Sequence, residues 1–332
     1  MWEIKRYNPD DKKNWDAFVE NSRNATFLFA RDYMDYHSDR FDDHSLLAFR
    51  NGKLCAILPA NESGDSLFTH QGLTYGGWIW SPKGLDVNDI FQLWSLWLEY
   101  CRGAGFVRII YKPLPFIYAV MPSQEDIYML YLSGAKLKVT DVSSAMDVSN
   151  NPGFNKLQKR HLNALGTSDI VKLITNQDLS DISCFHNLLT ECLDTRHNTV
   201  PVHSLQELVS LMNKFPDNIK IWTLYSNGTL EAGICGYITT SCLHCQYIAT
   251  SEEGRKKNVL ARVVSTMIKY CEGNDIRYLD FGISNEEYGR LLNTGLNRQK
   301  TSYGASGVVY QRYEINVNDA LTSWPTSLWP RQ

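Results

Sequence analysis

Asn227-Gly-Thr-Leu-Glu-Ala232 repeats, with two substitutions, a stretch that comes earlier in the chain as Asn51-Gly-Lys-Leu-Cys-Ala56. Each Asn-Gly pair stands between apolar, strand-like runs, and this pair tolerates the positive φ angles of a type I′ hairpin turn. Tyr100-Cys-Arg-Gly103 and Tyr270-Cys-Glu-Gly273 repeat in the same order, each at the end of an amphipathic helical pattern. The chain therefore contains a faint internal duplication.

Each half of the chain has the same predicted order: hairpin, strand, helix, strand, helix, strand. The halves meet at the turn-rich Ser149–Gly153, which predicts domains at residues 1–149 and 150–332. We expect an α/β fold of the α+β kind, with one mixed sheet in each domain. The remaining elements are predicted as strands at 66–70, 106–111, 243–250 and 276–281, and helices at about 124–132 and 286–293, closed by Gly134 and Gly295.

Composition restricts the class of protein. The chain has 332 residues, of which 43% are hydrophobic and 21% charged, and this is ordinary for a folded protein. A net charge of −3 argues against DNA binding by phosphate neutralisation. The start of the chain shows no signal-like apolar segment, no run is long enough to cross a bilayer, and the eight cysteines are scattered. We expect a cytoplasmic protein with no DNA partner and no membrane insertion.

Three stretches near the C-terminus carry a family resemblance. Leu279-Asp-Phe-Gly-Ile-Ser-Asn-Glu286, Leu292-Asn-Thr-Gly-Leu296 and Lys300-Thr-Ser-Tyr-Gly-Ala305 resemble the signature of the FemAB-related tandem branch of the GNAT superfamily. The loop Thr69–Gly77 also looks familial. The resemblance implies two tandem GNAT-like domains and an acyltransferase. The branch includes enzymes that use acyl-CoA and peptidyltransferases that use aminoacyl-tRNA.

Four residues are candidates for the chemistry of acyl transfer. In the resembling families a lysine at the position of Lys300 lines the transfer site, where an ammonium can steady a carbonyl oxygen or a donor phosphate. Tyr303 is a candidate hydrogen-bond donor, and Asp280 and His70 are candidate bases. Each also has a plain structural interpretation, since a strand-end Asp can cap a turn and a lone His or Tyr commonly packs in a core.

The donor site implied by the resemblance lies between the strand near Thr250 and the helix that begins near Val259. GNAT proteins hold the pyrophosphate of CoA there, on backbone amides at the positive end of a helix. The candidate residues are Gly254, Arg255, Lys256, Lys257 and Asn258. The family pattern prefers two spaced small residues, and Glu252 and Glu253 would repel phosphate, so a solvated surface run is an equal alternative.

Further residues of the two familial segments are candidates for contact with the substrate. Tyr75 is a possible hydrogen-bond donor in a glycine-rich loop that suits close approach to a neutral or sugar-like group. The full set is Tyr75, Gly76, Ser284, Glu286 and Asn293.

Three other sequence features give weaker evidence about function. Asp280-Phe-Gly282 also occurs in kinases, but the other kinase motifs are missing. Cys242 and His244 would face one side of a strand and Cys245 the other, so we expect no metal site. Many GNAT enzymes place a tyrosine four residues before the glycine that closes the fourth helix, whereas this chain has Leu130 and Leu291 there. The missing tyrosine fits the tandem branch better.

The leading hypothesis is an N-acyltransferase that moves an acyl group from acyl-CoA, such as acetyl-CoA, to an amino group. A nucleotide-linked amino sugar or a cell-envelope precursor is the acceptor suggested by analogy. The first alternative is an aminoacyl-tRNA-dependent peptidyltransferase, for which the basic helix predicted at 154–165 is a possible RNA contact. The second is a GNAT-fold binding protein without turnover.

Overall fold

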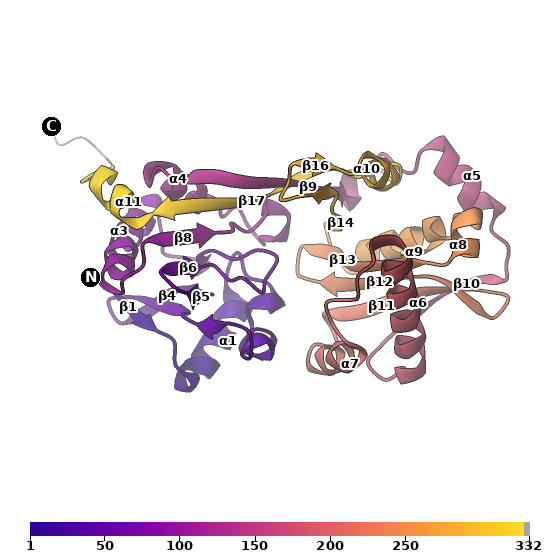
Figure 1. Ribbon diagram of the computed structural model, residues 1–332, viewed down its shortest axis with the longest axis horizontal. Coiled ribbons are helices and arrows are strands. Elements are labelled where there is room, and N and C mark those ends of the chain that lie inside the picture. Colours follow the sequence, from indigo (N-terminus) through magenta and orange to yellow (C-terminus); the bar gives the residue numbers. More distant parts are fainter. Residues whose placement is uncertain (329–332) are drawn as a thin grey trace. The chain divides into compact units, whose positions relative to one another are not determined.

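The computed structural model describes residues 1–328, apart from the side chains of residues 37, 196 and 197. It divides into two compact units (Figure 1). The first comprises Met1–Asp141, Glu287–Arg290 and Val309–Gln332, and the second comprises Val142–Glu286 and Leu291–Val308. Residues 329–332, the end of the predicted C-terminal half, lie outside the described residues.

The first unit contains two sheets, with strand orders β1-β3-β4-β7 and β2-β5-β6-β8-β17-β9. The pairs β1–β3, β3–β4, β4–β7, β2–β5, β5–β6 and β8–β17 are antiparallel, whereas β6 and β8 run parallel. The long helix α3 packs its tryptophans into the core beside Trp78 and Trp80. The strands are β1 (Trp2–Arg6), β2 (Asp42–Asp43), β3 (Leu46–Arg50), β4 (Lys53–Leu58), β5 (Asn61–Ser63), β6 (Ser66–Phe68), β7 (Ile79–Trp80), β8 (Arg108–Tyr111), and parts of β9 (Lys136–Asp147) and β17 (Ser306–Asn316); the helices are α1 (Lys12–Asn21), α2 (Arg31–Met34), α3 (Val87–Gly103), α4 (Glu125–Leu132) and α11 (Val317–Ser323).

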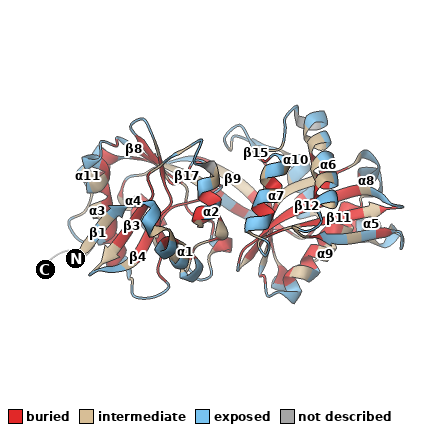
Figure 2. Ribbon diagram, turned by 90° about the horizontal axis from the view of Figure 1, so that it is seen from below, coloured by how far each residue is buried: buried red, intermediate tan, exposed pale blue. Residues whose placement is uncertain are grey.

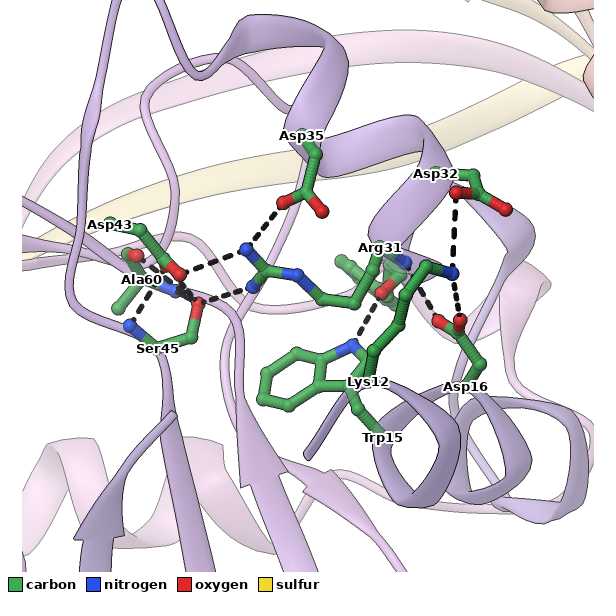
Figure 3. A network of polar contacts seen from close by, with 10 residues as sticks. Lys12, Trp15, Asp16, Arg31, Asp32, Asp35, Asp43, Ser45 and Ala60 are labelled. Carbon is green, nitrogen blue, oxygen red and sulfur yellow. Dashed lines mark hydrogen bonds and ion pairs between the residues drawn. The ribbon is translucent and has the colours of Figure 1, made fainter. Parts of the chain in front are cut away.

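A buried arginine holds the N-terminal helices of this unit to its sheet (Figure 3). Arg31 on α2 is only 4% exposed, and its guanidinium forms ion pairs with Asp35 and with Asp43 at 2.8 Å. The guanidinium also stacks over the ring of Tyr7, 3.9 Å from its centroid. The charge is thus desolvated but compensated by two carboxylates, as a buried ion requires.

The main sheet of the second unit has the order β10-β11-β12-β13-β14-β9, and β15 and β16 form a separate two-stranded sheet. Its strands are antiparallel except the central pair, β13 and β14. Helix α9 covers one face, where it buries an apolar core against the strands, and α6 and α7 cover the other (Figure 2). The elements are β10 (Asp169–Ile174), β11 (Ile219–Ser226), β12 (Thr229–Ile238), β13 (Cys242–Thr250), β14 (Tyr278–Ile283), β15 (Asn285–Glu286), β16 (Leu291–Leu292), α5 (Lys156–Ala164), α6 (Leu179–His197), α7 (Leu205–Lys214), α8 (Glu252–Lys257), α9 (Leu260–Gly273) and α10 (Thr294–Thr301).

Both predicted hairpin turns are present. Asn51 and Gly52 have φ angles of 51° and 78°, and Asn227 and Gly228 have φ angles of 51° and 83°. Two successive residues with positive φ match the twist of the flanking strands, as the Asn-Gly signal requires.

The helix predicted at 286–293 is wrong. Those residues form the two-stranded hairpin β15–β16, because Glu287, Tyr288 and Gly289 all have positive φ angles. The helix of this region is α10, and Gly295 is its second residue rather than its closing glycine. Leu291, four residues before Gly295, is therefore a strand residue and does not occupy the helix position where many GNAT enzymes have a tyrosine.

The compact units differ from the predicted division at residue 149. Strands β9 and β17 each have residues in both units, and the first seven residues of the second unit, 142–148, precede the turn-rich segment. The predicted division at 149/150 concerns the boundary between the two sequence repeats. The compact units are defined by contacts between residues, so they do not test that boundary, and it stays a prediction.

Candidate functional site

The two parallel strands at the centre of the second unit separate after three residue pairs. Cys242 pairs with Tyr278, Leu243 with Leu279, and His244 with Asp280, after which the pairing with β14 ends while β13 runs on to Thr250. His244 and Asp280 therefore lie side by side at the point of separation, the strand fork, on the same face of the sheet.

Asp280 is a fully buried carboxylate with three donors. Its Oδ2 lies 2.8 Å from Nδ1 of His244, and its Oδ1 accepts from the hydroxyl of Ser143 and, at 3.2 Å, from the amide of Gly282. The imidazole of His244 keeps 16% of its surface exposed. A buried carboxylate that accepts from Nδ1 fixes the tautomer of the ring and leaves proton transfer to Nε2.

A bulge turns the next aromatic side chain to the same face as His244. Cys235 of β12 pairs with Tyr247, and its neighbour Gly236 pairs with Cys245, so Gln246 is the extra residue. The hydroxyl of Tyr247 lies 2.5 Å from Nδ1 of His203, which precedes α7. This face of β13 therefore points toward the α6–α7 side of the unit.

Lys300 is buried on α10, with 5% of its surface exposed. Its ammonium donates to the carbonyl oxygens of Gly282 at 2.8 Å and Ile283 at 2.6 Å, both in β14. Burial lowers the pKa of Lys300 to about 8, although the charge of Asp280 and the thiol of Cys245 partly oppose this. An ammonium has three N–H donors, so one remains for a ligand or transition state.

The predicted lysine and aspartate thus meet at one place, whereas Tyr303 has a different environment. Its ring packs between Phe154, at 5.4 Å, and Phe281, at 5.7 Å, and is buried. Burial raises the pKa of Tyr303 to about 12. Its surroundings are those of a core residue, and its assignment as a proton donor stays a prediction.

Three candidate substrate residues lie together beyond β14. Ser284 is 2% exposed, and its hydroxyl has no hydrogen-bond partner in the described part of the chain. Asn293 donates to Glu286 at 3.1 Å, and its backbone amide donates to the carbonyl of Ser284. Asn293 also caps α10 by accepting from the amide of Leu296, so it fixes the start of the helix that carries Lys300.

The junction after β13 is helical rather than an open glycine loop. Gly254 approaches β12, since a Cβ there would lie 2.4 Å from the carbonyl oxygen of Glu231, and its amide donates to the Ser251 hydroxyl. The amides of residues 255, 258, 259, 261 and 262 also have partners within the chain. These particular amides are therefore not available to a phosphate, and the donor site at residues 254–258 stays a prediction.

The side chains of this junction remain candidates. Lys256 pairs with Glu252 and Glu253, while Arg255 and Lys257 are exposed on α8. Asn258 has a φ of 54° and ends α8 in the left-handed conformation.

The other candidates, His70, Tyr75 and Gly76, belong to the first unit, where their loop closes the equivalent fork between β6 and β8. The amide of Gly76 donates to the carbonyl of Lys112 at 2.8 Å, and a Cβ at Gly76 would lie 1.6 Å from the carbonyl oxygen of Thr69. His70 is buried and its Nδ1 accepts from the amide of Gly72, while Tyr75 packs beside Tyr118. Gly76 is therefore required by the close packing of its backbone against that of Thr69.

Sequence reasoning missed His244 and Ser143. His244 was considered only with Cys242 and Cys245 as a zinc ligand, but its partner is Asp280 and both cysteines are buried. Among the side chains that the structure describes, no group of three or more His, Cys, Asp or Glu could hold a metal ion. The same part of the chain contains no helix of the length and apolarity needed to cross a membrane.

Comparison with known proteins agrees with this architecture. Residues 156–290 match the family model of the acetyltransferase (GNAT) domain. No curated protein sequence matches the chain. Among solved structures, FemX aligns with a TM-score of 0.68 at 12% identity, covering 96% of this chain and 98% of FemX.

Two further structures align over nearly the whole chain. L-PGS from Bacillus licheniformis has a TM-score of 0.59 at 11% identity, covering 96% of this chain and 97% of that one. The C-terminal domain of a putative lysylphosphatidylglycerol synthetase from Agrobacterium fabrum has a TM-score of 0.58 at 12% identity, covering 96% and 95%. At these identities the likeness establishes the fold, which is a two-domain mixed α/β GNAT fold.

Proposed function

We propose that this chain, whose residues 156–290 match the model of the acetyltransferase (GNAT) domain and whose fold is like that of FemX, is an acyltransferase that transfers an activated acyl group to a primary amine at the strand fork. The observation that carries this proposal is the buried Asp280 that holds His244, with the ammonium of Lys300 on the adjoining carbonyls of β14. These groups supply the two requirements of acyl transfer, which are proton removal and stabilisation of an oxyanion.

In the proposed reaction the amine attacks the acyl carbonyl, and Nε2 of His244 takes the proton that the nitrogen loses. Asp280 stabilises the imidazolium that forms, because its carboxylate already faces Nδ1 at 2.8 Å. The remaining N–H of Lys300 and the unpaired hydroxyl of Ser284 are the donors proposed for the oxyanion or the acyl carbonyl. Collapse of the tetrahedral intermediate then forms the amide and expels the donor's leaving group.

The donor that we propose is an acyl-CoA such as acetyl-CoA, and the acceptor an amino group on a nucleotide-linked sugar or a cell-envelope precursor. Since the amides of Gly254, Arg255 and Asn258 have partners within the chain, the phosphates of CoA would pair with the exposed side chains of Arg255 and Lys257. Lys256 already has two carboxylate partners and contributes less.

A second candidate is an aminoacyl-tRNA donor, as in part of the FemAB-related branch. The occupied amides of Gly254, Arg255 and Asn258 favour it, because an RNA donor does not require a pyrophosphate cradle at this junction. The reacting ester and the amine would use the same His244, Asp280 and Lys300.

The first experiment is a calorimetric titration of the protein with acetyl-CoA. We expect saturable binding that Arg255→Glu weakens and that Lys269→Glu, a charge reversal at an exposed position near the far end of α9, leaves unchanged. No binding at millimolar ligand would remove acyl-CoA and make aminoacyl-tRNA the next donor to test.

The second experiment measures transfer to an amine acceptor in single turnover. Asp280→Asn and His244→Gln should each lower the rate by about 100-fold or more while the fold is kept, since general base catalysis contributes about 10²–10⁴-fold. An unchanged rate in both variants would contradict the assignment of the site.

A further inference from the structure

Two segments of the second unit lack acidic residues and lie against each other. Residues 148–168 contain Lys156, Lys159 and Arg160, residues 291–308 contain Arg298 and Lys300, and neither contains Asp or Glu. The amide of Asn155 donates to the carbonyl of Ser302 at 3.0 Å, and Gln158 donates to the hydroxyl of Ser302, also at 3.0 Å. Figure 1 shows α5, α10 and β16 along the same upper side of this unit.

Helix α5 is fixed so that its cations face outward. Phe154 is buried before its first turn, and Arg262 of α9 donates to the carbonyls of Leu165 and Gly166 after its last turn. Gln158 faces inward, while Lys156, Lys159 and Arg160 are exposed. Their spacing of three and four residues places these cations along one stripe of the helix.

Exposed leucines accompany these cations. Leu157 on α5 is 49% exposed, Leu291 and Leu292 on β16 are 49% and 41% exposed, and Leu296 on α10 is 37% exposed. We define the α5–α10 face as Leu157 and Leu296 with Lys156, Lys159, Arg160 and Arg298. Apolar side chains in water gain free energy when a partner buries them, and cations gain when that partner is anionic.

We infer that the α5–α10 face docks this protein on an anionic phospholipid surface. On such a surface the cations bind the anionic lipid headgroups, while the exposed aliphatic side chains enter the upper part of the acyl-chain region. A nucleic acid is less well matched, because neither acid-free segment exposes a Phe, Tyr or Trp ring for stacking on bases. This inference adds a location to the proposed acyl transfer and does not depend on the donor.

The test is co-sedimentation of the full chain with phosphatidylcholine vesicles that contain or lack phosphatidylglycerol. We expect binding only to the anionic vesicles, with affinity that falls as salt rises. The triple variant Lys156→Gln, Lys159→Gln, Arg160→Gln should bind on the order of 100-fold more weakly, at about fivefold per cation.

The matched control is Lys53→Gln, Lys83→Gln, Arg102→Gln, which removes three exposed cations of the first unit. It should bind as the unchanged protein does. Leu157→Ser with Leu296→Ser should weaken binding while keeping the salt dependence, which separates the apolar contribution from the charge.

Equal binding to both vesicle types, or full binding by the α5 triple variant, would overturn the inference. So would binding of unfractionated tRNA that the triple variant loses while vesicles fail to compete, since the face would then be an RNA surface. Turnover of a soluble amine acceptor measures the proposed function separately, because the triple variant keeps His244, Asp280 and Lys300.

Discussion

Replacing Lys300 by Met tests the buried ammonium through the pH dependence of stability. The substitution keeps the length of the side chain and removes its charge. In the folded protein burial lowers the pKa of this amine from 10.5 to about 8. Between these values the unfolded chain binds the proton and the folded chain does not, so the stability of the unchanged protein rises with pH.

The size of the effect follows from the two pKa values. Protonated Lys300 costs folding about 3 kcal/mol below pH 8, at about 1.36 kcal/mol per pKa unit, and the cost disappears above 10.5. Between pH 7 and pH 9.5 the unchanged protein should gain about 2 kcal/mol relative to Lys300→Met. The variant also leaves the carbonyls of Gly282 and Ile283 without the amine, which costs about 1–3 kcal/mol at every pH.

The assay is urea unfolding at several pH values, followed by the fluorine resonance of 5-fluorotryptophan at position 222. Trp222 is the one tryptophan in the segments that form the second unit, so its signal reports this unit separately. A difference in unfolding free energy between the two proteins that stays constant from pH 7 to pH 9.5 would refute the buried, destabilised ammonium.

Three further substitutions test the first unit. Arg31→Met leaves two carboxylates of the network in Figure 3 unpaired and should cost about 3 kcal/mol in urea unfolding, whereas the exposed Arg6→Met should cost less than about 1 kcal/mol. Gly76→Ala places a Cβ 1.6 Å from a backbone carbonyl oxygen and should lower the free energy of unfolding by more than about 3 kcal/mol. The control Gly103→Ala, whose Cβ would have nothing within 4 Å, should be neutral or slightly stabilising. Equal melting temperatures of the two variants would contradict the close approach at Gly76. Burial raises the pKa of Asp126 to about 7. The unchanged protein therefore loses stability as the pH rises from 4 to 7, because this buried carboxyl must ionise. Between pH 4 and pH 8 the free energy of unfolding of Asp126→Asn should rise, relative to that of the unchanged protein, by up to about 4 kcal/mol. A pH-independent difference would show that this carboxyl does not titrate near pH 7.

Local patterns were sufficient for much of the fold. The Asn-Gly pairs predicted both hairpins because positive φ at two successive residues is a property of those residues themselves. The helices that end at Gly103 and Gly273 followed from apolar periodicity, and the C-terminal signature led to Asp280 and Lys300.

Where neighbouring chain segments decide the conformation, the sequence predicted less. Residues 286–293 have a helical apolar spacing, yet positive φ angles at Glu287 and Tyr288 make a hairpin. The basic junction after β13 resembled an amide cradle, but Ser251 caps a short helix there and takes the amide of Gly254.

The sequence alone predicted the duplication, the GNAT-like order of elements and the lysine and aspartate of the candidate site. Only the tertiary structure decided that His244 is the partner of Asp280, because residues 36 positions apart meet through the register of two parallel strands. It also decided that the fork of the first unit is closed by its own loop, since the contact of Gly76 with Thr69 depends on how the loop folds back. Register and backbone approach are set by packing between segments, and a single sequence does not encode them in any local pattern.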